Sequence, residues 1–230
     1  MNPPIIFAHR GASGSCPENT LLAFRRALEI GALWLELDVQ LCEGQLVVFH
    51  DDDLARTTNG RGRLADWSFA ELRKLDAGQG ERIPLLDEVL DLARGRAQVN
   101  IELKGEKTGV PVAELLERRV AEGTSAFDDV LISSFLPEEL RDFQQRLPQV
   151  RRAPICEELP PDFAQQLEFF APWSLHLDKA LVDDKIMRLA RDRGCKVFCW
   201  TVNSPKQAER LFRQGVQGIF TDFPERFIEG

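Results

Sequence analysis

The chain has 230 residues, 43 % of them apolar, and a formal net charge of −8. This length and apolar content suffice for one large α/β domain, and the acidic balance argues against a surface that binds nucleic acid or an anionic membrane. No stretch approaches the roughly 18 apolar residues that span a bilayer, and no signal peptide precedes the first apolar run. We therefore expect a cytoplasmic protein without stable membrane association.

Short runs rich in Val, Ile, Leu and Phe alternate with amphipathic segments of helical length. The runs occupy residues 4–8, 33–39, 46–49, 99–103, 130–134, 151–155, 174–177, 196–200 and 218–220. Such alternation predicts parallel strands joined by right-handed crossovers. A doubly wound sheet also fits, but about eight units in roughly 200–250 residues favour a TIM (β/α)₈-type barrel. We expect residues 1–230 to form one such domain.

The two runs within residues 33–50 leave no room for a crossover helix between them. They predict a β-hairpin, so that one of the strands distorts the barrel by running antiparallel to its neighbours. A three-residue bulged turn would pair Leu41 with Gln45 and place Glu36 opposite His50.

Residues 51–84 form a long segment that is polar, rich in turn residues and only briefly helical in pattern. Loops of this length in a compact domain are usually functional. We therefore interpret residues 51–84 as an insertion near the functional site.

Two histidines follow apolar runs in matching contexts. His9 precedes Arg10, and His50 precedes Asp51, each at the polar end of an apolar run. One such histidine is most simply a hydrogen-bonded residue at a strand end. Because strand ends converge on one mouth of a barrel, two of them indicate acid–base chemistry near neutral pH.

Three acidic residues occupy comparable positions on two of the runs. Glu36 and Asp38 are two residues apart and share one strand face, and Glu102 lies on a later run. Carboxylates that face a barrel interior need cations, and three of them suit Mg²⁺ or Ca²⁺ better than zinc. The alternative is a solvated outer face, or ion pairs with Arg10 or Lys104.

Arg10 and Lys104 place two fixed cations beside this acidic group. A divalent ion, a guanidinium and an ammonium at one mouth favour an anion with several oxygens, and phosphate is the commonest such ligand. Glu18 and Asn19 open a helix, and we expect them to cap it and support the His9 loop.

The ordered set of these motifs resembles the glycerophosphodiester phosphodiesterase family. The motifs are HRG, PENT, ELDVQL, LVVFHD, RTTNGRG, IPLLDEVL, NIELK, SSF, WTVN and TDFP, and they run from about Ile5 to Pro224. The resemblance implies a distorted TIM barrel that uses a divalent metal to hydrolyse glycerophosphodiesters to glycerol 3-phosphate and an alcohol.

The resemblance also implies roles for individual residues. His9 and His50 become acid and base, and Arg10 and Lys104 bind the phosphate. Glu36, Asp38 and Glu102 become ligands of one divalent cation, Mg²⁺ or Ca²⁺. The inserted segment 51–84 then covers the barrel mouth and helps to select the substrate.

Two aromatic residues extend this expected site. Trp200 ends a strand, and Phe135 follows another. Each is either an apolar wall for the glycerol or alcohol part of the substrate or simple packing at the barrel rim.

Three other functions remain open from the sequence. Two of the acids could serve a barrel glycosidase, although that leaves both histidines and both cations unexplained. The chain could instead bind a phosphorylated ligand without turnover, or cleave lysophospholipids or phosphoinositides on the same barrel. The alcohol head group, the metal and the oligomeric state are not determined by the sequence.

Overall fold

Strands and helices alternate along the chain, and the parallel strands close into a barrel. The computed structural model describes residues 3–161 and 163–228. The described strands are β1 (Ile5–His9), β2 (Trp34–Cys42), β3 (Gln45–Val48), β4 (Gln98–Leu103), β5 (Val130–Ser134), β6 (Arg151–Cys156), β7 (Ser174–Asp178), β8 (Lys196–Trp200) and β9 (Gly218–Thr221). Their order is β1-β9-β8-β7-β6-β5-β4-β2-β3, and parallel pairing of β1 with β2 closes the barrel. The expected TIM-type architecture is confirmed.

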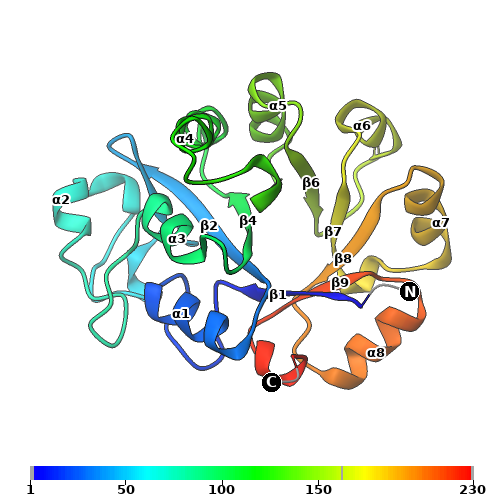
Figure 1. Ribbon diagram of the computed structural model, residues 1–230, viewed down its shortest axis with the longest axis horizontal. Helices are drawn as coiled ribbons and strands as arrows, with labels where there is room; N and C mark the ends of the chain where they lie inside the picture. The colour runs from blue at the N-terminus through cyan, green and yellow to red at the C-terminus, as the bar shows by residue number, and fades with distance from the viewer. Residues whose placement is uncertain (1–2, 162, 229–230) are drawn as a thin grey trace.

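The helices lie around the outside of the barrel (Figure 1). They are α1 (Leu21–Ile30), α2 (Phe69–Leu72), α3 (Leu86–Ala93), α4 (Gly109–Ala121), α5 (Pro137–Arg146), α6 (Phe163–Phe170), α7 (Asp184–Asp192) and α8 (Pro205–Arg213). The first of them, α1, begins where the Thr20 side chain accepts a hydrogen bond from Ala23 N. It ends at Gly31, which adopts a left-handed conformation with φ of 95°.

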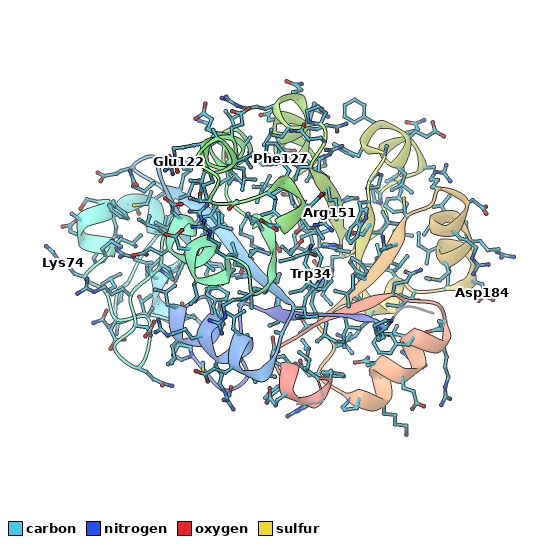
Figure 2. The ribbon with its side chains drawn as sticks, in the orientation of Figure 1. Trp34, Lys74, Glu122, Phe127, Arg151 and Asp184 are labelled. Atoms are coloured by element: carbon cyan, nitrogen blue, oxygen red, sulfur yellow. The ribbon has the colours of Figure 1, made fainter. Side chains whose placement is uncertain are left out.

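The period of two along each strand separates two kinds of core. Leu35, Leu37 and Val39 point outward from β2 and pack against the surrounding helices. A separate aromatic cluster, including Phe7 and Trp34, fills the barrel interior. Figure 2 shows Trp34 near the middle of the molecule, and the Arg151 guanidinium lies 5.2 Å from its ring centroid. Above this cluster, toward the carboxyl ends of the strands, the inward positions of β2 and β4 carry the acids Glu36, Asp38 and Glu102.

The β2–β3 hairpin is present, but its predicted register is wrong by one residue. Cys42 pairs with Gln45 and Leu41 pairs with Leu46. Glu43 and Gly44 have φ values of 47° and 78°, so the turn has two left-handed residues in place of the expected three-residue bulge. Because β3 ends at Val48, His50 does not pair with Glu36 in the ladder.

The segment 51–84 packs on the hairpin through a small apolar core of its own. It contains α2 and the short 3₁₀ helices η1 (Leu54–Arg56) and η2 (Leu64–Asp66). Leu54, Leu64 and Leu72 of this segment are buried in one cluster with Val47 of β3 and Phe49, which follows β3. The segment is therefore an ordered extension of the barrel beside β2 and β3, as Figure 1 shows at the position of α2.

Two chemical features of the fold bear on the sequence-based expectations. All five cysteines lie in the described part of the chain, and each is a free thiol. Within residues 3–161 and 163–228, we find no helix that combines the length and the apolar character needed to cross a membrane.

Gly11 lets the loop after β1 pass against α1, and this predicts a specific loss of stability. Its φ is 81°, and a Cβ built there would lie 2.6 Å from the backbone carbonyl carbon of Ala23. We expect Gly11→Ala to destabilise the protein by about 3 kcal/mol. Gly44→Ala is the matched control, because Gly44 also has positive φ (78°) but open space around it; its cost is about 1 kcal/mol. Equal unfolding midpoints of the two variants in urea would contradict this account.

Candidate active site

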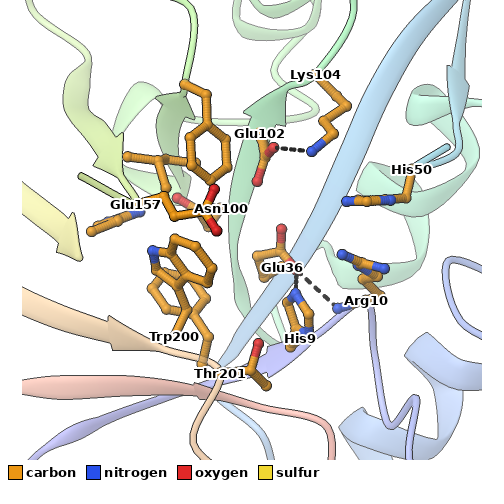
Figure 3. Close-up of a pocket in the computed structure, with 14 residues that line it drawn as sticks. His9, Arg10, Glu36, His50, Asn100, Glu102, Lys104, Glu157, Trp200 and Thr201 are labelled. Atoms are coloured by element: carbon orange, nitrogen blue, oxygen red, sulfur yellow. Dashed lines mark hydrogen bonds and ion pairs between the residues drawn. The ribbon is translucent and has the colours of Figure 1, made fainter. Parts of the chain in front are cut away.

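A cavity of about 230 Å³ opens at the carboxyl ends of the barrel strands. This is the end at which TIM barrels carry their active sites. All of the predicted site residues except Asp38 line it: His9, Arg10, Glu36, His50, Glu102, Lys104, Phe135 and Trp200. The cavity is shown in Figure 3. The fold thus brings together residues that are up to about 190 positions apart in the chain.

The strand register brings the three acids together. In the parallel ladders, Glu36 pairs with His9, and Asp38 pairs with Glu102. One carboxylate oxygen from each of Glu36, Asp38 and Glu102 lies within 4.8 Å of the other two, and all three residues are buried. The acids therefore face the barrel interior, and the alternative of a solvated outer face is wrong.

Arg10, Lys104 and Asn19 partly balance the negative charge. Arg10 Nε lies 3.2 Å from Asp38 Oδ2, and Lys104 Nζ lies 3.3 Å from Glu102 Oε1. Arg10 has a left-handed backbone with φ of 56°, and its N–H donates to Glu36 Oε2 at 2.9 Å. The Asn19 side-chain amide donates to Asp38 Oδ2 at 2.8 Å. The ion pairs considered in the sequence analysis are thus present around the acidic cluster.

These contacts do not fully neutralise the acids. Burial, and then repulsion from Asp38, raises the pKa of Glu102 to about 7. Burial and the charges of Asp38 and Glu102 also raise the pKa of Glu36 well above its ordinary value. Protons or a cation must therefore accompany the three acids at neutral pH.

The three acids fit a divalent metal ion by their donor chemistry. Within the described chain, Glu102 Oε1 is buried and has no hydrogen-bond partner of suitable geometry. Carboxylate oxygens are hard donors of the kind that Mg²⁺ and Ca²⁺ prefer. Glu36, Asp38 and Glu102 are therefore the residues that could hold such an ion.

A carboxylate fixes the ring of His9. Its Nδ1 lies 2.7 Å from Asp222 Oδ1, and its Nε2 lies 4.0 Å from Glu36 Oε2. Asn203 and Ser13 donate side-chain hydrogen bonds to Asp222. Although burial opposes ionisation, the bonds from His9 and Asn203 lower the pKa of Asp222 to about 2. The ionised Asp222 therefore keeps the proton on Nδ1 and leaves Nε2 free toward the cavity.

His50 is held in the same way by its neighbour in sequence. Its Nδ1 lies 2.5 Å from Asp51 Oδ1. Arg56 binds Asp51 with two of its nitrogens and Glu18 with two bonds of 2.6 and 2.8 Å. These hydrogen bonds from Arg56, and then the bond from His50, lower the pKa of Asp51 to about 2. Burial lowers the pKa of His50.

Glu18 connects Arg10, which follows β1, with Arg56 of the segment 51–84. Besides its bonds to Arg56, it accepts a hydrogen bond of 2.7 Å from Arg10 Nη1. The helix cap is supplied by Thr20, so the expectation that Glu18 and Asn19 cap α1 is wrong. Instead, Glu18 joins Arg10 to the segment 51–84, and Asn19 binds an acid of the cluster.

The aromatic residues lie on the other side of the cavity from Arg10 and His50. Phe135 and Trp200 meet edge to face, with ring centroids 5.6 Å apart. Lys104 Nζ is 5.2 Å from the Phe135 ring centroid. Figure 3 shows Glu157 on the same side as Trp200, with Glu36 and Glu102 between that side and His50. The cavity thus has a cationic side and an aromatic, acidic side.

Several residues of the site were not identified from the sequence. Asp51 and Asp222 orient the histidines. Glu157 and Asn100 also line the cavity. Asn100 shares the inward face of β4 with Glu102, so the period of two could have indicated it. No sequence signal pairs His9 with a carboxylate 213 residues away.

The fold and the cavity define a class of protein: a (β/α)₈ enzyme scaffold with an acidic cluster, two oriented histidines and two fixed cations at its mouth. Comparison with known proteins specifies the class further. A sequence model described as the Glycerophosphoryl diester phosphodiesterase family matches residues 9–226. The chain belongs to this family.

Curated relatives and solved structures agree with the family match. A glycerophosphodiester phosphodiesterase from Caldanaerobacter subterraneus is 38 % identical, with 97 % of this chain and 96 % of the relative covered. One from Bacillus altitudinis is 36 % identical over 97 % of this chain and 96 % of its own. An Oleispira antarctica phosphodiesterase, solved with the product sn-glycerol-3-phosphate, has a TM-score of 0.89 at 32 % identity, covering 97 % of this chain and 95 % of that one. These matches favour a phosphodiesterase over a glycosidase.

The raised pKa of Glu102 predicts how pH acts on the metal-free protein. The folded state binds this proton more tightly than the unfolded chain, whose glutamate titrates near about 4.3. The proton on Glu102 therefore makes its full contribution to the stability of the folded state below about pH 4.3. This contribution is lost as pH rises through about 7. In EDTA, we expect the melting temperature of the wild type to fall relative to that of Glu102→Gln between pH 5 and pH 8.

Addition of Mg²⁺ or Ca²⁺ at pH 8 should raise the melting temperature of the wild type and leave Glu102→Gln nearly unchanged. A metal-insensitive wild type, or an equal response of both proteins, would contradict this assignment of the acids.

The contacts of Arg56 predict a second measurable shift. Loss of its hydrogen bonds in Arg56→Ala should raise the pKa of Asp51 from about 2 toward the ordinary aspartate value of about 3.9. Carboxyl NMR titration measures this change directly. Arg61→Ala is the matched control, since Arg61 is an exposed arginine of the same segment with no ion pair to any described residue. An unchanged Asp51 pKa in Arg56→Ala would refute the arrangement.

Proposed function

We propose that the protein hydrolyses glycerophosphodiesters to glycerol 3-phosphate and an alcohol, with His9 and His50 as acid–base catalysts. One observation carries this proposal. Two histidines, each anchored through Nδ1 by an ionised aspartate, line the same cavity as the acids Glu36 and Glu102. The structural relative that was solved with sn-glycerol-3-phosphate supports the product.

We propose that Glu36, Asp38 and Glu102 hold one divalent cation, Mg²⁺ or Ca²⁺. When bound, the ion supplies Lewis acidity, which offsets the charge that develops on the phosphate oxygens. The acids converge in one buried cluster, and the raised pKa values of Glu36 and Glu102 favour an added positive charge at neutral pH. The family membership of the chain is consistent with this proposal.

Arg10 and Lys104 bind the remaining phosphate oxygens in this proposal. Arg10 is held by Glu18, Asp38 and its own backbone bond to Glu36, so its guanidinium needs little reorganisation when the substrate binds. Lys104 extends from the end of β4 over the same cavity. Both side chains line the cavity beside the acids, so a phosphate bound between them would meet two positive charges.

The environments of the histidines suggest which is the base. A lowered pKa favours the neutral imidazole, which is the form that accepts a proton, and burial lowers the pKa of His50. We therefore propose that His50 Nε2 accepts the proton of the attacking hydroxyl and that His9 protonates the departing alcohol. The attacking group is either the glycerol hydroxyl next to the ester, giving a cyclic phosphate that water later opens, or water itself.

We further propose that residues 1–230 form one barrel domain in which the segment 51–84 borders the mouth. Arg56 of this segment reaches Glu18 and Asp51, which supports a role in ordering the site. Phe135 and Trp200 would form the apolar wall for the alcohol.

The proposed roles of the histidines predict different responses to the leaving group. His9→Ala and His50→Ala should each lower kcat for glycerophosphocholine by at least about 100-fold. With glycerol 4-nitrophenyl phosphate, whose leaving group needs no proton, His9→Ala should lose far less activity while His50→Ala loses as much as before. Activity with the two esters would be measured in Mg²⁺ after circular dichroism has verified folding.

Wild-type rates in both variants would contradict the proposed function. A larger rescue of His50→Ala than of His9→Ala by the nitrophenyl ester would reverse the two roles.

A further inference from the structure

A second cavity adjoins the candidate active site on its aromatic side. It has a volume of about 380 Å³ and lies over the carboxyl ends of β5 and β6. It shares Phe135, Ile155 and Glu157 with the first cavity, so these side chains form the boundary between the two spaces. A phosphodiester held beside Arg10 and Lys104 can therefore direct one of its two arms toward this boundary.

The walls of this second cavity are mostly apolar, with Ser134 and a pair of glutamates as the polar residues of the described lining. Pro137, Leu140, Pro154 and Phe170 contribute apolar surface. The exposed Phe135 ring, 38 % accessible, lies at the junction of the two cavities. Such walls suit the hydrocarbon part of a small alcohol better than the hydroxyl-covered ring of a polyol.

The second cavity carries negative charge without a cation among its described lining residues. Glu157 and Glu158 line the second cavity, and both residues are exposed. Neither carboxylate forms an ion pair with any described residue, and the described lining contains no lysine or arginine. By contrast, Glu18, Glu36 and Glu102 all lie beside arginine or lysine. Glu157 is therefore free to receive a positive charge from a ligand.

The placement of the charges matches a zwitterion. Figure 3 shows Glu157 and Trp200 on one side of the cavity and Arg10, Lys104 and His50 on the other. An ester with an anionic phosphate near its centre and a cationic amine at the end of its alcohol would meet opposite charges at both positions. An alkylated ammonium also gains from aromatic faces, which Phe135 and Trp200 supply.

We propose that Glu157, with Phe135 and Trp200, forms a head-group subsite that selects glycerophosphodiesters whose alcohol carries a positively charged amine. The inference rests on the proposed function, because it takes the phosphate to lie beside Arg10 and Lys104. It names the class of alcohol released: an amino alcohol rather than a neutral polyol.

The test isolates charge from shape with two substrates. Glycerophosphocholine is compared with the glycerophosphoryl ester of 3,3-dimethylbutan-1-ol, in which carbon replaces the charged nitrogen. For the wild type we expect kcat/KM to favour the choline ester by about tenfold, the size of a partly exposed charge and cation–π contribution. Glu157→Gln should lower this ratio severalfold, because only the aromatic contribution of Phe135 and Trp200 then remains.

Glu138→Gln is the matched control, since Glu138 is an exposed glutamate of α5 outside the lining of the second cavity. Its ratio should equal that of the wild type. A wild-type ratio near one, or a tenfold ratio that persists in Glu157→Gln, would overturn the proposal.

Calorimetric binding of the two esters separates this inference from the proposed function. Charge-selective binding that Glu157→Gln weakens, without hydrolysis of either ester, would support the subsite while contradicting the proposed reaction. Hydrolysis of both esters with equal binding and equal kcat/KM would support the proposed reaction and contradict the subsite.

Discussion

The mutual repulsion of three buried carboxylates is the constraint on which the rest of the site depends. Glu36, Asp38 and Glu102 are brought together by the parallel register of β2 and β4, and burial raises the pKa of two of them. The aromatic cluster below them closes the barrel interior, so their charge must be compensated from the mouth. Arg10 and Lys104 supply part of this compensation, and a divalent cation would supply the remainder.

Ionised aspartates organise the surroundings of this acidic cluster. Asp222 and Asp51 have pKa values of about 2, and each holds one histidine through Nδ1. Around His50 the ion pairs form a continuous chain through Arg56 and Glu18 to Arg10. This chain of ion pairs links the segment 51–84, which packs on the β2–β3 hairpin, to Arg10 at the barrel mouth. It also contributes to the polarity of the cavity, because Arg10 and His50 lie on one side, whereas Glu157 on the other side pairs with no cation in the described part of the chain.

The barrel and most of the site followed from short-range patterns in the sequence. Strand-end histidines and acids two residues apart are local signals, and a parallel barrel brings strand ends together whatever its details. The hairpin register did not follow, because it depends on Glu43 adopting a left-handed conformation, and one residue more in the turn shifts the whole ladder. The pairing of His9 with Asp222 was also out of reach, since it joins the first and last strands of the barrel.

The most direct test of the account is to locate the metal. Crystals soaked in Mn²⁺ would be measured at a wavelength where manganese scatters anomalously. We predict one strong anomalous peak within about 2.6 Å of a carboxylate oxygen from each of Glu36, Asp38 and Glu102. A peak elsewhere, or none at this cluster in crystals of protein that is active with Mn²⁺, would contradict the central claim that these acids share a divalent cation.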